Sequence, residues 1–302
     1  MMKLIASSTP SRGLALALLA ACGFASTASA TDYYWRGNGG TNYWSATALW
    51  KPNEDGTGSS PSSISSADTF IVTNVVGAMG TNPTSSGTNT FAGGTLVLAN
   101  GQLSVKATGS GLARVTNFIT TGGGLIIAAE TSNATHNLRV ENFNNQSGAT
   151  RLSASTQGNN RTLNLSIGTL TGSGGFTIDA NSGSTRPIKI SIDDATGYTG
   201  DFGFANGLID FDNDFASGGS LTLSGTSVLV LDQSVSFTAV TINGTSLAAG
   251  TYSFADLNAA FDAFFADGGT GSITVAAVPE PASAATLAGA ALLGLVALRR
   301  RR

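Results

Sequence analysis

The amino-acid sequence predicts an all-β chain whose body is a right-handed parallel β-helix, a solenoid of stacked coils. Three observations predict it: short apolar runs of alternating pattern, a glycine-led phrase that recurs, and no long helical pattern before residue 255. The body spans residues 31–277, between two segments that have the composition of targeting signals. A β-sandwich is the alternative, since it also needs many short strands.

The predicted strands are short runs rich in Val, Ile, Leu, Thr and Phe, bounded by Gly, Asn or Ser. Such runs are typical of β-strands joined by turns. We expect strands within residues 69–76, 95–105, 124–129, 161–167, 176–179, 207–212, 220–232 and 234–242.

A repeated phrase, in which small residues and glycine precede an apolar residue, marks the expected coils. Its glycines are Gly94, Gly124, Gly148, Gly175 and Gly207, at spacings of 30, 24, 27 and 32 residues. A drifting period of this size is typical of solenoid coils whose loops differ in length. Glycine adopts the left-handed conformation without steric cost, so we expect these glycines to form turns.

A short amphipathic helix is expected near residues 256–266. Its apolar positions follow helical spacing: Leu257, Ala260, Phe261, Phe264 and Phe265. Asp256 can cap its start, and Gly268-Gly269 can end it. We interpret the helix as a lid over the open edge of the last coil, with a partner-binding helix as the alternative.

Residues 1–30 have the order of a secretory signal peptide. Lys3 and Arg12 precede an apolar stretch at about residues 14–24, and Ala28-Ser29-Ala30 follows. We therefore expect export by the secretion machinery, with cleavage after Ala30. A buried N-terminal helix and a lipoprotein box that would lipidate Cys22 are the alternatives.

Charge and composition exclude several functions. Residues 31–281 hold nine basic and 18 acidic residues, a net charge of −9, so no nucleic-acid partner is expected. Cys22 is the only cysteine, and cleavage after Ala30 would leave no disulfide or cysteine-based site. His136 is the only histidine, which excludes a zinc site built from several histidines. We expect no cofactor.

No catalytic constellation stands out, so the chain is not expected to be an enzyme. A Ser-His-Asp triad would need His136, which lies among Asn and Thr without a nucleophile-elbow pattern nearby, and we expect a surface histidine in a turn. Some β-helices cleave acidic polysaccharides with Asp-held Ca²⁺ and a basic residue. Arg186 and Lys189 lie near Asp193 and Asp194 in the sequence, but no spacing rule makes these residues a site.

Two further clusters are candidate binding residues. Asp210, Asp212 and Asp214 alternate and would share one face of a strand, where Ca²⁺ could separate them, although the EF-hand pattern fails. A solvated acidic face without metal is the favoured interpretation. The three tryptophans could stack on sugar rings or form a hydrophobic cap on the first coil: Trp35, Trp44 and Trp50.

The strand phrases and the Trp-Gly-rich opening "YYWRGNGGTNYWSATALW" resemble the β-strand repeats of bacterial autotransporter passengers. The resemblance implies a solenoid body. It covers the body only, because autotransporters end in an outer-membrane barrel of many strands, whereas this chain ends in one apolar run.

The last segment, residues 278–302, combines three features. Pro279-Glu280-Pro281 comes first, and its prolines keep the chain extended. Residues 284–298 carry no charge and as a helix would span about 22 Å, so they could cross the ~30 Å bilayer core only with local help. A basic cluster follows and should stay cytoplasmic: Arg299, Arg300, Arg301 and Arg302.

This order resembles the PEP-CTERM sorting signal of Gram-negative bacteria. The resemblance implies that an exosortase, a transpeptidase-like enzyme of the inner membrane, recognises Pro279-Glu280-Pro281 and removes the helix, so that the membrane anchor is transient. Together with the absence of a catalytic constellation, the resemblance leads us to expect an exported, non-catalytic protein of the cell surface or extracellular matrix, associated with exopolysaccharide. A plain C-terminal anchor is the alternative for the tail, and a polysaccharide-binding or polysaccharide-degrading β-helix is the alternative for the body.

Overall fold

The computed structural model describes residues 30–37, 43–73, 78–128, 134–154, 161–178 and 187–277. The described residues from Thr31 onward belong to one compact unit, and of residues 1–30 only Ala30 is described. The predicted signal peptide with Cys22 and the whole of residues 278–302 therefore lie outside the described part. Within that part, no helix has the length and apolarity needed to cross a membrane.

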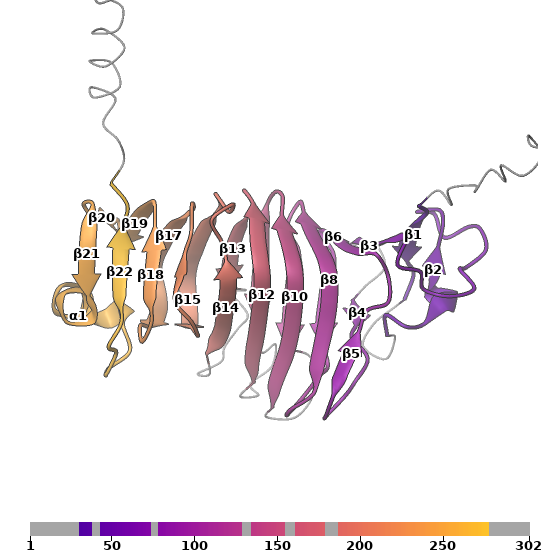
Figure 1. The fold of residues 1–302 in the computed structure, drawn as a ribbon, viewed down its shortest axis with the longest axis horizontal. Coiled ribbons are helices and arrows are strands. Elements are labelled where there is room, and N and C mark those ends of the chain that lie inside the picture. The colour runs from indigo at the N-terminus through magenta and orange to yellow at the C-terminus, as the bar shows by residue number, and fades with distance from the viewer. Residues whose placement is uncertain are drawn as a thin grey trace, which may run out of the picture. The chain divides into compact units, whose positions relative to one another are not determined.

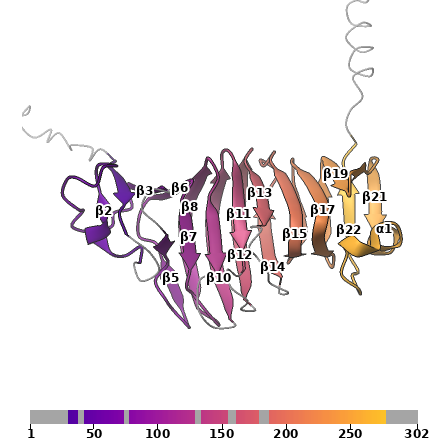
Figure 2. The ribbon, with the colours of Figure 1, turned by 180° about the vertical axis from the view of Figure 1, so that it is seen from behind.

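The body is a β-solenoid of about five turns, as the sequence predicts, and its described residues include one short α-helix. The coils stack in the order of the chain, from the indigo N-terminal strands to the orange and yellow C-terminal ones (Figure 1), and the view from behind shows the same stack (Figure 2). The last strand, β22 (Ser272–Val275), departs from this order because it lies between β18 (Ser234–Phe237) and β21 (Gly250–Ser253). Strands of successive coils pair in parallel, as β8 (Leu112–Thr121), β10 (Thr135–Asn145), β12 (Thr162–Gly172) and β14 (Ile188–Asp194) do. A Greek-key sandwich has antiparallel strands, so the parallel ladder excludes that alternative.

In the first half of the body, the described residues form a 3₁₀ turn, η1 (Thr47–Leu49), and ten strands. The strands are β1 (Asp32–Trp35), β2 (Trp50–Lys51), β3 (Thr69–Thr73), β4 (Met79–Gly80), β5 (Thr88–Thr90), β6 (Thr95–Ala99), β7 (Gln102–Val105), β8 (Leu112–Thr121), β9 (Leu125–Ala128) and β10 (Thr135–Asn145).

In the part of the second half that the structure describes, twelve strands accompany the helical segments α1 (Phe254–Phe261) and η2 (Asp262–Phe264). The strands are β11 (Ala149–Ser153), β12 (Thr162–Gly172), β13 (Gly175–Ile178), β14 (Ile188–Asp194), β15 (Asp201–Phe211), β16 (Phe215–Ala216), β17 (Ser220–Val230), β18 (Ser234–Phe237), β19 (Ala239–Ile242), β20 (Thr245–Ser246), β21 (Gly250–Ser253) and β22 (Ser272–Val275).

Apolar side chains stack coil upon coil inside the solenoid. Leu138, Leu165 and Ile190 pair in register along β10, β12 and β14, and all three are buried. Inward and outward residues alternate along strands such as β3, β6 and β13, so every second residue there contributes to the core. This alternation is the physical basis of the sequence pattern that predicted the fold.

Aromatic rings form a column through the core. The ring centroids of Phe118 and Phe143 lie 4.9 Å apart, those of Phe143 and Phe176 lie 5.5 Å apart, and those of Phe176 and Phe202 lie 5.4 Å apart. The first two pairs meet edge to face, a favourable geometry for rings with a quadrupole. The column links β8, β10, β13 and β15, and so ties successive coils together.

Only part of the expected role of the repeated glycines is found. Gly148 and Gly207 have φ of +71° and +83°, in the left-handed region. Gly94, Gly124 and Gly175 have no such φ, so the prediction of left-handed turns is wrong for these three. At Gly94, a Cβ would instead lie 3.0 Å from the Asp68 carbonyl oxygen, so glycine there permits close packing of two chain segments.

The predicted lid helix is present, with a different start and end. Ser253, not Asp256, is the N-cap of α1, and Asp256 completes a capping box in which each residue binds the other's backbone. The helix ends at Phe261 and continues as η2, before the expected glycines. Leu257 is buried as expected, whereas Ala260 is exposed.

Candidate functional site

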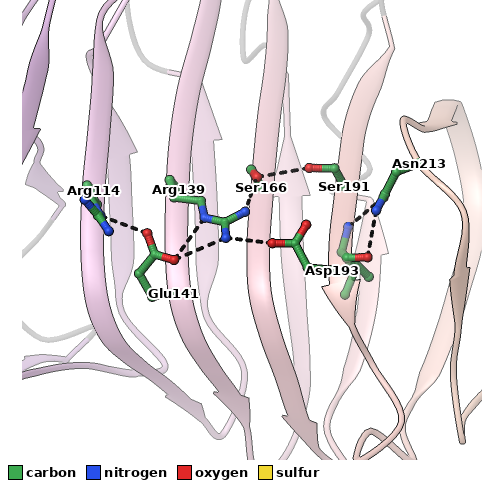
Figure 3. A network of polar contacts seen from close by, with 8 residues as sticks. Arg114, Arg139, Glu141, Ser166, Ser191, Asp193 and Asn213 are labelled. Atoms are coloured by element: carbon green, nitrogen blue, oxygen red, sulfur yellow. Dashed lines mark hydrogen bonds and ion pairs between the residues drawn. The ribbon is translucent and has the colours of Figure 1, made fainter.

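One outer face of the solenoid carries a row of polar and charged side chains. Arg114, Arg139, Ser166 and Ser191 occupy equivalent outward positions in β8, β10, β12 and β14, because the strands pair in register. Figure 3 shows these side chains converging into one network with Glu141 and Asp193. The row therefore runs across four coils.

Arg139 lies at the centre of this network. Its Nη2 lies 2.7 Å from Asp193 Oδ2 and 3.1 Å from Glu141 Oε2, and its Nη1 donates to Ser166 Oγ at 2.8 Å. Glu141 also pairs with Arg114, whose Nε lies 2.8 Å from Oε1. The pKa of Glu141 is lowered, chiefly by the hydrogen bond from Arg139. The carboxylates therefore neutralise two arginines that the strand register places side by side.

A second charged group lies on the same face at Lys189. Its Nζ lies 2.9 Å from Asp210 Oδ2 and 3.0 Å from Asp212 Oδ1. The pKa of Lys189 is raised, chiefly by the hydrogen bond to Asp210. An ammonium held in this way stays protonated at neutral pH and is a poor general base.

The alternating aspartates do not form one cluster. Asp210 and Asp212 converge on Lys189, whereas Asp214 accepts a hydrogen bond from the Ser234 backbone N–H at 2.7 Å. In the described part of the chain, no group of three or more His, Cys, Asp or Glu is placed to hold a metal ion. The calcium interpretation therefore finds no support, because an ammonium takes the position between two of the carboxylates.

Of the two basic residues near Asp193 and Asp194 in the sequence, the described one, Lys189, forms its ion pairs elsewhere. Lys189 pairs instead with Asp210, inside β15, and with Asp212, just after it, and Arg186 lies outside the described residues. Asp193 pairs with Arg139, and Asp194 accepts hydrogen bonds from the backbone and hydroxyl of Thr196. Proximity in the sequence therefore does not bring Lys189 together with these two aspartates in the fold.

A shallow groove of about 370 Å³ lies on this face. Its lining includes Leu112, Asn137, Asn164, Ser166, Lys189, Ser191 and Asp212. Asn137 anchors its wall, donating to the carbonyls of Gly109 and Gly111 at 2.9 Å each. Asn164 Nδ2 donates to Asn137 Oδ1 at 2.9 Å, so a hydrogen bond between side-chain amides links one coil to the next.

The tryptophans are placed as a cap, not as a sugar platform. Trp35 and Trp44 are 1% exposed and Trp50 is 0% exposed. Trp35 and Trp50 pair across the antiparallel β1–β2 ladder, with ring centroids 5.0 Å apart. Sugar stacking needs an exposed ring face, and none of the three offers one, so that interpretation is incompatible with their burial.

The surface position expected for His136 is also wrong. His136 lies inside β10 and is 0% exposed. Neither ring nitrogen has a partner of hydrogen-bond geometry among the described residues. Its pKa is lowered to about 4, chiefly because burial disfavours the charged imidazolium, while the Val105 carbonyl acts in the opposite direction.

Sequence reasoning did not single out Arg114, Arg139, Glu141, Ser166 or Ser191. A signal was nevertheless present, because polar residues alternate with apolar ones in "NLRVEN", "LNLSIG" and "IKISID". Alternation of this kind places the polar residues on one face of a strand. No family model, no curated protein and no solved structure matches this chain, so a function must be argued from its own residues.

Proposed function

We propose that this chain is an exported, non-catalytic protein of the bacterial surface or extracellular matrix, associated with exopolysaccharide. In this proposal residues 1–30 direct export and residues 278–302 are a PEP-CTERM sorting signal. The observation that carries it is the order of the tail: Pro279-Glu280-Pro281, then the uncharged residues 284–298, then four arginines.

The tail suits a transient anchor better than a lasting one. A helix over residues 284–298 would be shorter than the hydrocarbon core, and moving the arginines that follow across it would cost several kcal/mol. Those charges would hold the tail in the inner membrane, with the proline-flanked motif on the outer side. An extended peptide there is accessible to an exosortase, whose cleavage would release the body to the surface or the medium.

The non-catalytic part of the proposal is supported by how the charged side chains are used. Lys189 stays protonated between two aspartates, and the imidazole of His136 is buried in the core. Arg139 is engaged by Glu141 and Asp193. These groups serve the fold, which favours a scaffold over a polysaccharide-degrading enzyme. Polysaccharide binding without cleavage remains the second candidate, favoured by the groove across the coils.

Mass spectrometry of the protein from a host with a working exosortase tests the sorting proposal. We expect a C-terminus at or near residues 279–282 and a body free of the inner membrane. Replacing Pro279-Glu280-Pro281 with three alanines should leave the full tail in the membrane. The matched control replaces Asn53-Glu54-Asp55 with three alanines and should be processed normally. A wild-type protein that keeps Arg302 and stays in the membrane would make the tail an ordinary anchor.

A further inference from the structure

The groove on the β10–β14 face repeats its polar groups at the strand spacing. Asn164 in β12 pairs in register with Lys189 in β14, and Ser166 pairs with Ser191 two residues further along the same strands. Neighbouring strands lie about 4.8 Å apart, which is comparable with the length of one sugar ring in an extended chain. A linear polysaccharide lying along the solenoid axis would therefore meet similar groups at each ring.

The hydrogen bonds inside the groove leave donors and acceptors for a ligand. Ser166 Oγ accepts from Arg139 Nη1 at 2.8 Å and from Ser191 Oγ at 3.0 Å. A hydroxyl has one proton and two acceptor sites, so the Ser166 proton and the acceptor sites of Ser191 remain for a ligand. Of the three protons of Lys189, two are directed to Asp210 and Asp212, which leaves one.

The two ends of the groove add acceptors, from Asp212 after β15, and an apolar contact, from Leu112 in β8. Asp212 has a side chain that is 54% exposed, and only its Oδ1 faces Lys189, so Oδ2 can accept from sugar hydroxyls. Leu112 is partly exposed in the lining and can contact the C–H face of a ring. Sugar hydroxyls both donate and accept, and this mixed lining matches them.

The charges of the face favour a neutral sugar over an acidic one. Lys189 meets two carboxylates, and Arg139 meets Glu141 and Asp193. A uronate would have to compete with these carboxylates for each cation while facing their repulsion. A neutral polymer pays no such penalty, because it offers only hydroxyl groups.

We propose that this groove binds a neutral, linear polysaccharide through the hydroxyls of successive sugar rings. This inference rests on the proposed association with exopolysaccharide, and it names the face and the chemical class of the ligand. Ser166, Ser191, Lys189 and Asp212 make the polar contacts, and Leu112 makes the apolar one.

Isothermal titration calorimetry on the purified full chain tests the ligand class. The probes are neutral linear hexasaccharides of glucose, mannose and galactose, with hexagalacturonate as the acidic comparison. We expect at least one neutral hexasaccharide to bind and hexagalacturonate to bind at least about tenfold more weakly. Binding of none of the neutral probes, or equal binding of hexagalacturonate, would overturn the proposal.

Two variants test the location of the site. Asp212→Asn should weaken binding of the neutral probe about tenfold, because it removes a charged acceptor. Ser191→Tyr should abolish binding by filling the groove, and it serves as a second test should Asp212→Asn fail to fold by circular dichroism. Asp232→Asn, at an exposed aspartate outside the groove, is the control and should bind as the wild type does. Unchanged binding in both groove variants would place the ligand elsewhere.

The proposal for the groove and the proposal for the sorting signal can be contradicted independently of each other. A protein that is cleaved near Pro281 but binds no neutral hexasaccharide would overturn the groove alone. A protein that binds the sugar but keeps its tail in the membrane would overturn the sorting proposal alone.

Discussion

His136 lies in register with Leu163 of the next coil, so an imidazole takes an inward position that is otherwise apolar. Ile188 continues the same row in β14. The pKa of His136 is lowered to about 4 in the folded protein, against 6.5 for an ordinary histidine. Between these values the unfolded chain binds more protons than the folded one. Stability should therefore fall as the pH drops from about 6.5 to 4, by up to about 3 kcal/mol, and this loss should level off below pH 4.

His136→Leu should remove this loss. Leucine matches Leu163 and leaves no polar atom buried without a partner, so we expect the variant to be as stable as the wild type at pH 7 or more stable. Urea unfolding at pH 7, 5.5 and 4.5 measures the difference in the free energy of unfolding between wild type and His136→Leu. Because both proteins contain the same carboxylates, the titration of these groups cancels in that difference. Leu163→Met, a conservative change in the same row, is the control and should follow the wild-type pH dependence. Parallel loss of stability in wild type and His136→Leu would contradict the expected depressed pKa.

Alternation along the strands made much of the fold predictable. The apolar runs predicted β3, β6, β12 and β17, because their inward residues are Leu, Ile, Val or Phe and few charges interrupt them. By contrast, β8, β10 and β14 were missed. Their outward positions hold Arg114, Arg139, Glu141 and Asp193, which lower the apolar content of each run.

The charged side chains that lower the apolar content of these strands also form the polar network. Their partners lie in other coils, so sequence spacing could not pair them: Arg139 and Asp193 are 54 residues apart. Burial of His136 was unpredictable for the same reason, since it is set by which strand lies alongside. For the tryptophans the sequence left two interpretations open, and neighbouring strands decide between the buried cap and the exposed sugar platform. The local sequence pattern thus predicts the strands of a coil, whereas the register between coils determines which side chains meet at the candidate site.

Glu141→Gln should weaken the charge network. Glu141 lies between Arg114 and Arg139, which are paired in register, and its removal leaves two like charges side by side. We expect the free energy of unfolding to fall by about 0.5–1 kcal/mol at low ionic strength and by less in 1 M NaCl, where salt screens the charges. Because the pKa of Glu141 is lowered on folding, its contribution is present above the ordinary glutamate pKa and is lost as the pH falls through the folded value.

Chemical unfolding at low and high salt measures this effect. Glu54→Gln, at an exposed glutamate in the first coil, is the matched control and should change stability little at either salt concentration. A Glu141→Gln loss that is independent of salt would argue for packing and against charge as its cause.

Gly219 marks a close approach between two coils. A Cβ at this position would clash with the carbonyl oxygen of Gly200, which belongs to the backbone and cannot rotate away. Gly219→Ala should therefore destabilise the protein by about 2 kcal/mol or more. At Gly197 the nearest atom to an added Cβ is Thr171 Cγ2, at 3.3 Å. Gly197→Ala should therefore destabilise the protein much less than Gly219→Ala. Equal temperatures of thermal unfolding for the two variants would contradict the clash at Gly219.

Trp35 and Trp50 are almost equally buried but differ in hydrogen bonding. Trp50 Nε1 donates to the Trp44 carbonyl at 3.0 Å, whereas Trp35 Nε1 is buried with no partner among the described residues. Replacing an unpaired indole by a phenyl ring removes a desolvated donor, but replacing a paired one leaves a buried carbonyl unsatisfied. Trp50→Phe should therefore cost about 1–3 kcal/mol more than Trp35→Phe, although both lose similar ring area.

Urea unfolding of the two variants measures this difference, and fluorescence of the wild type tests the burial on which it depends. Iodide should quench the three tryptophans only weakly, because a charged quencher does not enter an apolar core. In urea the quenching should become strong, which supplies the control within one sample. Strong quenching of the folded protein would mean that an indole is exposed. An exposed indole would again be available to stack on a sugar ring at the first coil. In the urea experiment, equal stability of the two Phe variants would show that the hydrogen bond of Trp50 does not stabilise the fold.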